Sequence, residues 1–133
     1  MLQRAVGEIR DYRDLKVWQL AIELAPLVYR LVKRLPQAET YAMGDQMRRA
    51  AVSISANIAE GQARQHTREF LQHLCIARGS LAELDSLFVI SERLGYLPSA
   101  ELNPLRDQMG DLRRSLYGLT SALKSKLRAT TAP

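Results

Sequence analysis

Cysteine and aromatic residues are scarce in this sequence of 133 residues. The chain has one cysteine, Cys75, and its aromatic residues amount to 6% of the total. A single cysteine cannot form an internal disulfide bond, which argues against a disulfide-rich secreted domain. Because aromatic side chains are few, the core must be built from Leu, Ile, Val, Ala and Met. Such a composition is typical of a helix bundle.

Long hydrophobic runs are also missing. The most apolar stretch, residues 15–32, is interrupted by Lys16, Gln19, Glu23, Pro26 and Arg30, whereas a transmembrane helix needs about 20 consecutive, mostly apolar residues. The first 14 residues carry several charges and no apolar run, so no secretory signal is visible. We therefore expect a cytoplasmic protein with no membrane partner.

Motifs that carry catalysis are absent from the sequence. It contains no phosphate-binding P-loop, no dinucleotide-binding glycine motif, no His-Glu-x-x-His and no Gly-x-Ser-x-Gly. His66, His73 and Cys75 lack the spacing of a zinc site. We therefore expect a protein that is not an enzyme and that holds neither a metal ion nor another cofactor.

The length and the charge describe one small basic domain. Domains most often run to about 100 to 150 residues, so one fold is expected. We predict an N-terminal extension over residues 1–12, a folded domain over 13–128 and a frayed tail over 129–133. The net charge is +5, from 19 Lys and Arg against 14 Asp and Glu, and both chain ends are basic. Excess positive charge favours polyanionic partners such as nucleic acid.

Apolar residues recur at spacings of three and four in four segments, which predicts four helices. These segments are residues 14–34, 41–60, 67–94, and a last one that ends near Leu127 and begins at either Ser99 or Asn103. Asp14 fits the N-cap of the first helix, and Gly61 and Gly95 fit the positions that follow the second and third. The connections are short, so consecutive helices should be antiparallel. The predicted fold is all-α, an antiparallel up-down-up-down four-helix bundle.

The first helix carries a wider apolar face than one neighbouring helix can cover. Beside its main apolar stripe runs a second one that includes Trp18, Ile22 and Tyr29. We predict that these three residues contact another subunit, so that the protein forms a homo-oligomer.

Polar residues flank the apolar faces of the second and third helices. They are Gln46, Arg49, Ser53, Asn57 and Glu60 on the second, and Ser80 and Glu83 on the third. One interpretation is a network of hydrogen bonds and ion pairs between helices, since partly buried charges are normally paired. The other interpretation is a groove for a ligand or RNA. If the network is right, Arg49→Ala should clearly lower the melting temperature.

Basic residues that could contact nucleic acid lie on the second predicted helix, around the loop that follows it, and on the last helix. Phosphate contacts require only positive charge at the surface, so their spacing leaves a solvated basic face as an alternative. The candidates are Arg48, Arg64, Arg68, Arg113, Arg114, Lys124, Lys126 and Arg128.

Three motifs resemble the 23S rRNA intervening-sequence protein family, also called the S23 family. They are DLKVWQ at residues 14–19, QMRRAAVSI at 46–54 followed by NIAEG at 57–61, and ARGSLAEL at 77–84. The resemblance implies an antiparallel four-helix bundle that assembles as a ring-like homopentamer. It also implies a likeness to accessory proteins of diversity-generating retroelements, in which a basic pentamer partners nucleic acid and a reverse transcriptase. The family motif marks Gly61 and the seven residues of the polar stripe.

These observations lead to one main hypothesis and one alternative. The main hypothesis is a non-enzymatic homo-oligomeric bundle, with a pentamer favoured, whose basic surface binds structured RNA or DNA as an accessory protein. The alternative is a protein-binding scaffold or accessory subunit that has no direct role with nucleic acid and whose charge only aids solubility.

Overall fold

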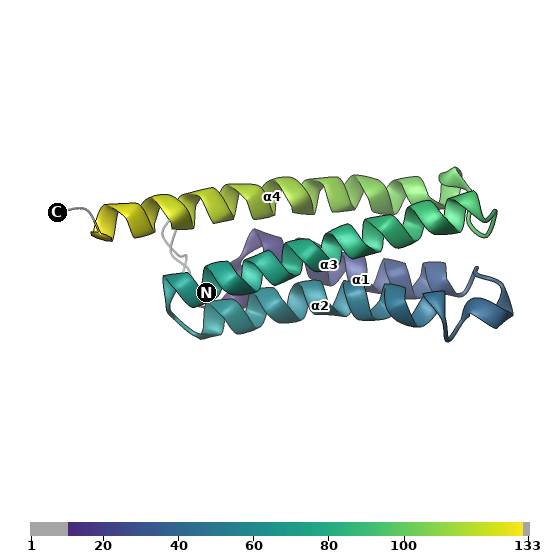
Figure 1. The fold of residues 1–133 in the computed structure, drawn as a ribbon, viewed down its shortest axis with the longest axis horizontal. Helices are drawn as coiled ribbons and strands as arrows, with labels where there is room; N and C mark the ends of the chain where they lie inside the picture. Colours follow the sequence, from purple (N-terminus) through teal and green to yellow (C-terminus); the bar gives the residue numbers. More distant parts are fainter. Residues whose placement is uncertain (1–10, 132–133) are drawn as a thin grey trace, which may run out of the picture.

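Four α-helices follow one another in the computed structural model, which describes residues 11–131 (Figure 1). Two short 3-10 helices, η1 and η2, precede α1 and α2, and no strand occurs within the described residues. The elements are η1 (Tyr12–Asp14), α1 (Lys16–Val32), η2 (Gln37–Glu39), α2 (Met43–Ala63), α3 (Thr67–Arg93) and α4 (Ser99–Thr131). The predicted all-α class is confirmed.

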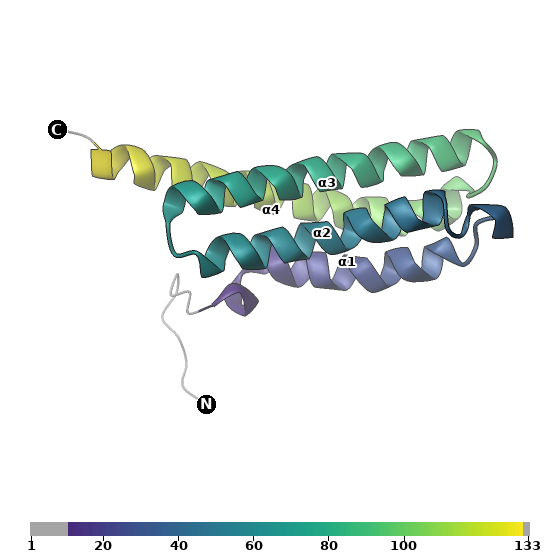
Figure 2. The same ribbon diagram turned by 60° about the horizontal axis from the view of Figure 1, so that its bottom comes forward.

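The helices form a closed square in which each one runs opposite to the next. α1 packs against α2, α2 against α3 and α3 against α4, and α4 returns to lie beside α1. The short turns at alternating ends of the bundle are visible in two views (Figures 1 and 2). This arrangement is the predicted antiparallel up-down-up-down bundle. Within residues 11–131, no helix is long and apolar enough to cross a membrane.

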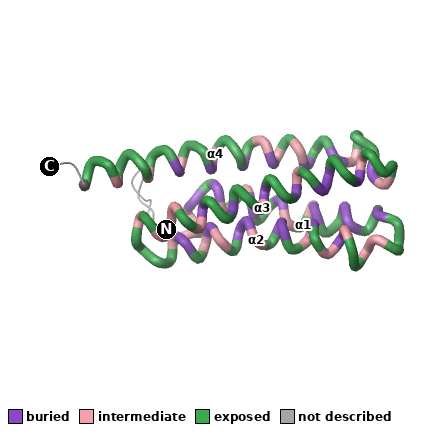
Figure 3. The backbone as a smooth tube through the Cα atoms, in the orientation of Figure 1, coloured by how far each residue is buried: buried purple, intermediate pink, exposed green. Residues whose placement is uncertain are grey.

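The heptad stripes of the sequence form the core. Leu24, Val28, Met47, Leu84 and Leu112 are among the fully buried side chains, and each comes from the apolar stripe of its helix. Burial decreases toward the C-terminal end of α4, where Leu119 and Leu123 are only partly buried. Figure 3 shows that the last turns of this helix, which extend past the rest of the bundle, are mostly exposed.

Both predicted boundaries of the folded domain differ from the observed ones. Tyr12, predicted to be part of the extension, lies in η1 and packs against the core. At the other end, α4 continues to Thr131, past the predicted limit at residue 128. The rest of the predicted extension, residues 1–10, and the end of the predicted tail, residues 132–133, lie outside the described residues.

The predicted N-cap of the first helix is wrong, because η1 intervenes. Asp11 caps η1 by accepting a hydrogen bond from the Arg13 amide at 2.7 Å. The Asp14 carboxylate accepts one in return from the Asp11 amide at 3.3 Å, which completes a capping box. The N-cap of α1 is Leu15, which provides no side-chain hydrogen bond.

Gly61 does not end α2, as the sequence predicted. It is buried inside the helix, against α3, and α2 continues to Ala63. The chain reverses instead at Gln65, whose φ of 61° lies in the left-handed region. The prediction for Gly95 is confirmed, because this residue follows α3 with a φ of 76° that is accessible mainly to glycine. α4 begins at Ser99, the earlier of the two predicted starts, and encloses Pro104.

Candidate nucleic-acid interface

Two arginines from different helices line one shallow groove between α3 and α4. Arg78 of α3 and Arg113 of α4 border it together with Cys75, Gly79 and Ala82, around a volume of about 420 Å³. Both arginines are exposed, and within residues 11–131 neither side chain forms an ion pair or a hydrogen bond. An unpaired guanidinium presents several donors in a plane, which suits it to bind the oxygens of a phosphate.

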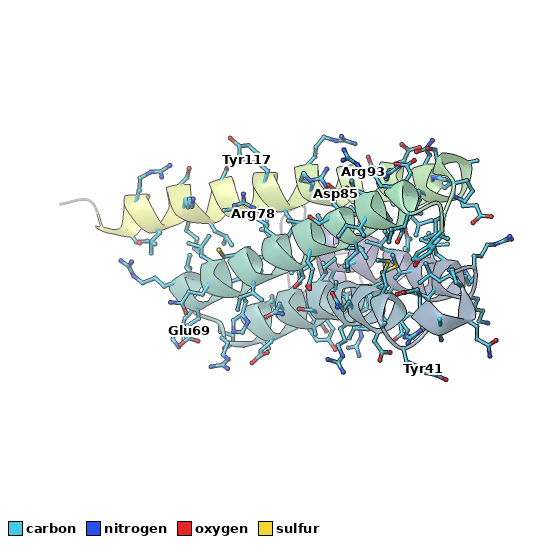
Figure 4. The ribbon with its side chains drawn as sticks, turned by 45° about the vertical axis from the view of Figure 1, so that its right-hand side comes forward. Tyr41, Glu69, Arg78, Asp85, Arg93 and Tyr117 are labelled. Atoms are coloured by element: carbon cyan, nitrogen blue, oxygen red, sulfur yellow. The ribbon has the colours of Figure 1, made fainter. Side chains whose placement is uncertain are left out.

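Tyr117 and Lys124 continue this surface along α4. Tyr117 follows Arg113 by about one helical turn, and Lys124 lies about two turns further on, so the three residues share one side of the helix. Tyr117 is 71% exposed. Figure 4 shows its ring pointing away from the bundle, and shows Arg78, Asp85 and Arg93 along the neighbouring part of α3. Arg78, Arg113, Tyr117 and Lys124 are called the α3/α4 basic face below.

An ion pair joins α3 and α4 at one end of the bundle. Arg106 of α4 binds Glu92 of α3, with 3.1 Å between Nη2 and Oε1. The hydrogen bond from Arg106, and a second one from Ser99, lower the pKa of the Glu92 carboxyl below its usual value of 4.5. Because the helices are antiparallel, residues before Glu92 on α3 lie beside residues after Arg106 on α4, and the long side chains of Arg78 and Arg113 reach the same groove.

Arg48, a predicted nucleic-acid contact, forms hydrogen bonds within the chain. Its guanidinium donates a hydrogen bond of 2.9 Å to the Thr40 carbonyl and a second one to the Asp45 carboxylate. The side chain is 20% exposed. It therefore joins the η2 turn to α2, and Arg48 is not included in the surface described above. The sequence could not reveal this role because Thr40 acts through its backbone oxygen.

The remaining candidates divide into paired and unpaired residues. Arg64 forms an ion pair with Glu60 at 3.0 Å, Arg114 forms one with Asp111, and Arg128 donates a hydrogen bond of 3.2 Å to Ser125. Arg68, Arg113, Lys124 and Lys126 make no such side-chain contact with the part of the chain that the structure describes. Lys126 lies apart from Lys124, in a groove at the end of the bundle that His66 and Phe70 also line.

Arg78 and Tyr117 were missing from the predicted contacts. Arg78 lies inside the motif ARGSLAEL, and nothing in that motif distinguishes it from an ordinary solvent-exposed residue of a helix. Only the alignment of α3 against α4 brings it to the groove that Arg113 lines. Tyr117 directly follows a leucine of the α4 core stripe. Because it lies outside the three-and-four spacing of that stripe, the sequence did indicate that its side chain is exposed.

Part of the polar stripe forms a hydrogen-bond network between α2 and α3. The hydroxyl oxygens of Ser53 and Ser80 lie 2.8 Å apart. Asn57 donates from Nδ2 to the Ser53 carbonyl at 2.9 Å, and its Oδ1 lies 3.1 Å from Nδ1 of His73. Because Asn57 uses its amide nitrogen as the donor, its oxygen accepts, and His73 must carry a hydrogen on Nδ1. His73 therefore belongs to the network although it was not predicted to.

Four predicted members of the network lie outside it. Glu60 is exposed and pairs with Arg64 along the same helix. Gln46, Arg49 and Glu83 are exposed, and among residues 11–131 their side chains have no hydrogen-bond or ion-pair partner. Helical periodicity places all seven residues near the seam between α2 and α3, but only the small side chains Ser53, Asn57 and Ser80 face directly into it.

The opposite side of the molecule carries an apolar groove between α1 and the η2 turn. Ile22, Ala25, Pro26, Tyr29 and Tyr41 line it, around a volume of about 780 Å³. Of the predicted interface residues, Ile22 is 40% and Tyr29 46% exposed. Trp18, in contrast, packs against the core, with its ring edge-on to Tyr12 at a centroid distance of 5.2 Å. Trp18 therefore contributes to the bundle itself.

No cluster of metal-binding side chains was found among residues 11–131. Nowhere in that range do three His, Cys, Asp or Glu residues gather in a way that could hold a metal ion. Of the residues that the sequence singled out, His73 is engaged with Asn57, and Cys75 is exposed as a free thiol.

Known proteins resemble this chain both in sequence and in fold. The model of a family described as 23S rRNA-intervening sequence protein matches residues 13–118. A crystal structure from Bacteroides thetaiotaomicron, of a protein with unknown function from the S23 ribosomal protein family, superposes with a TM-score of 0.72. It is 23% identical, and the match covers 78% of this chain and 97% of that one. No curated protein matches this chain. The matched range contains Arg78, Arg113 and Tyr117 and ends before Lys124.

Proposed function

Because this chain belongs to the 23S rRNA-intervening sequence protein family, we propose that it is a non-enzymatic accessory protein that binds RNA or DNA as a homo-oligomer. The binding surface is the α3/α4 basic face. The number of subunits that the family resemblance favours is five. We propose a cytoplasmic location, where an exposed free thiol such as Cys75 remains reduced.

The observation that carries the nucleic-acid part is the meeting of Arg78 and Arg113 in one groove. Within residues 11–131 neither guanidinium has an acidic partner, so the groove concentrates positive charge. A bound phosphate between or beside them would neutralise that charge and accept charge-assisted hydrogen bonds. Lys124, on the same side of α4 as Arg113, adds a third cation that has no partner among the described residues. The surface therefore complements a phosphate backbone.

The apolar surfaces support the oligomeric part. Ile22 and Tyr29 are exposed on α1, and Ile76 and Ile90, at 51% and 46%, are exposed on α3. Two different apolar faces on one chain favour a head-to-tail contact between copies, which closes into a ring when the rotation is suitable. A ring would also repeat the basic face in every subunit, so that weak phosphate contacts add up through avidity.

The proposal is tested by measuring affinity for nucleic acid against salt. Fluorescence anisotropy with a structured RNA and a duplex DNA should show a logarithm of affinity that falls linearly with the logarithm of salt concentration. The slope should be about −0.9 for each phosphate contact on duplex DNA. Arg113→Glu should weaken binding and reduce the slope.

Lys16→Glu is the matched control for that variant. Lys16 is exposed at the start of α1, outside the basic face, and its replacement changes the net charge by the same amount. An equal effect of both variants would show that only overall charge matters and would remove the α3/α4 basic face from the proposal. No binding at low salt would reject the nucleic-acid function and leave a partner protein as the candidate.

A further inference from the structure

We propose that the α3/α4 basic face binds single-stranded nucleic acid and that Tyr117 stacks on an unpaired base. This inference rests on the proposed function, which requires only that phosphates bind, and it specifies the form of the nucleic acid. The observation behind it is an aromatic ring that is 71% exposed and lies on α4 between Arg113 and Lys124, two cations that have no partner in the part of the chain that the structure describes. A tyrosine gains little by facing water, since its ring is apolar.

The surroundings of Tyr117 leave the ring accessible. Gly118 follows it directly, and Gly110 lies seven residues before it, about two helical turns away on the same side of α4. A Cβ at Gly118 would meet nothing within 4 Å, and one at Gly110 would meet only the Arg114 guanidinium. Glycine inside an exposed helix costs about 1 kcal/mol relative to alanine. Packing among residues 11–131 requires neither glycine, whereas a ligand that lies against α4 would benefit from both.

The spacing along α4 suits a strand whose backbone and bases are both exposed. Arg113 and Lys124 stand on either side of Tyr117, roughly 6 Å and 10 Å away along the helix axis at about 1.5 Å per residue. A single strand can place phosphates on such cations while a base between them turns onto the aromatic ring. In a duplex the faces of the bases are stacked on one another, so a ring on the surface of a straight helix cannot reach them.

The test compares single strands with a duplex for four proteins: the wild type, Tyr117→Ala, Tyr117→Phe and Tyr41→Ala. The probes are fluorescent oligouridine and oligothymidine of about 20 nucleotides and a duplex DNA of equal length. Tyr41 is the control because it is 82% exposed and lies at the opposite edge of the molecule from Tyr117 (Figure 4). Comparison of the RNA strand with the DNA strand shows which of the two nucleic acids the protein prefers.

We expect the wild type to bind the single strands more tightly than the duplex. Tyr117→Ala should weaken single-strand binding at least about fivefold and duplex binding little, while Tyr117→Phe and Tyr41→Ala stay close to the wild type. If Tyr117→Ala leaves single-strand affinity unchanged, or if the duplex binds more tightly, stacking is rejected while the proposed function stands. If no probe binds, both proposals fail. Circular dichroism should show that Tyr117→Ala folds normally, because the side chain is exposed.

Discussion

Gly61 of α2 lies directly against the His73 side chain of α3. A Cβ at position 61 would stand 2.6 Å from the Cβ of His73 and 3.1 Å from Cδ1 of Phe70. The first distance is well inside van der Waals contact, so the residue must be glycine for α2 and α3 to approach as they do. This pair of helices also carries the hydrogen-bond network of Ser53, Asn57, Ser80 and His73.

Gly61→Ala should therefore destabilise the protein by about 1–3 kcal/mol, the usual cost of an added group in a well-packed core. Gly79→Ala is the matched control, since a Cβ there meets nothing within 4 Å. It should raise stability by about 0.5–1 kcal/mol through helix propensity. Urea denaturation followed by circular dichroism measures both. A neutral or stabilising effect of Gly61→Ala would mean that α2 and α3 are less closely packed than described.

Asn57→Ala and Arg49→Ala should differ clearly in stability. Removal of Asn57 leaves Nδ1 of His73 without its partner at a half-buried site, which should cost about 1–2 kcal/mol. Arg49 is exposed and has no partner in the described chain, so its replacement should stay within about 0.5 kcal/mol. This reverses the expectation from sequence that Arg49→Ala lowers the melting temperature. A loss for Arg49→Ala as large as that for Asn57→Ala would show that Arg49 has a partner on another molecule.

Arg48→Ala should reduce stability rather than binding. Arg48 holds the η2 turn to α2 through the Thr40 carbonyl and the Asp45 carboxylate, and loss of hydrogen bonds from a charged donor costs about 1.5–3 kcal/mol. The slope of nucleic-acid affinity against salt should stay at its wild-type value under conditions in which the variant is folded. A reduced slope with an unchanged melting curve would restore Arg48 as a phosphate contact.

The contribution of Glu92 to stability should depend on pH. Arg106 and Ser99 lower the pKa of Glu92 in the folded protein, so the folded state holds this proton less tightly than the unfolded state. The stabilisation is then present above the unfolded value, near 4.5, and is lost as the pH falls through the lower folded value.

The thermal unfolding of Glu92→Gln tests this pH dependence. Its melting temperature should lie below that of the wild type at neutral pH, and the two should converge at acid pH. Glu83→Gln removes the same charge from an exposed residue that has no partner among residues 11–131, and it should show no comparable convergence. A gap between Glu92→Gln and the wild type that persists at acid pH would contradict the assignment.

Assembly should depend on the apolar groove beside α1. Multi-angle light scattering at micromolar concentration should give a mass of at least twice the 15.0 kDa of one chain. Tyr29→Glu places a charge in the groove and should shift the protein toward the monomer, because burying an unpaired carboxylate is costly. Tyr117→Glu, on the α3/α4 basic face, should leave the mass unchanged. A wild-type monomer would remove the oligomer from the proposal.

The helices and their buried faces were predictable because both depend on local spacing. Val17, Leu24, Val28 and Leu31 repeat at intervals of three and four, which places them on one side of any α-helix. The short connections then leave few topologies, so the four-helix bundle follows from the sequence. The ends of the helices were predicted less well. Asp14 and Gly61 are residue types that favour caps, but a 3-10 turn and a close helix contact determine their actual roles.

The sequence by itself determined the fold class, the apolar faces and the excess of positive charge. Tertiary structure decided which charges are free and which residues meet. Arg48 and Arg113 look alike in the sequence. Arg48 donates a hydrogen bond to the backbone oxygen of Thr40, whereas Arg113 faces solvent in the groove that Arg78 also lines. The physical reason is that helical periodicity specifies the direction in which a side chain points, whereas its partners depend on how antiparallel helices align. That alignment depends on all the contacts between the helices, from the buried core to the pair of Arg106 and Glu92, and many of them lie far from the residues that it brings together.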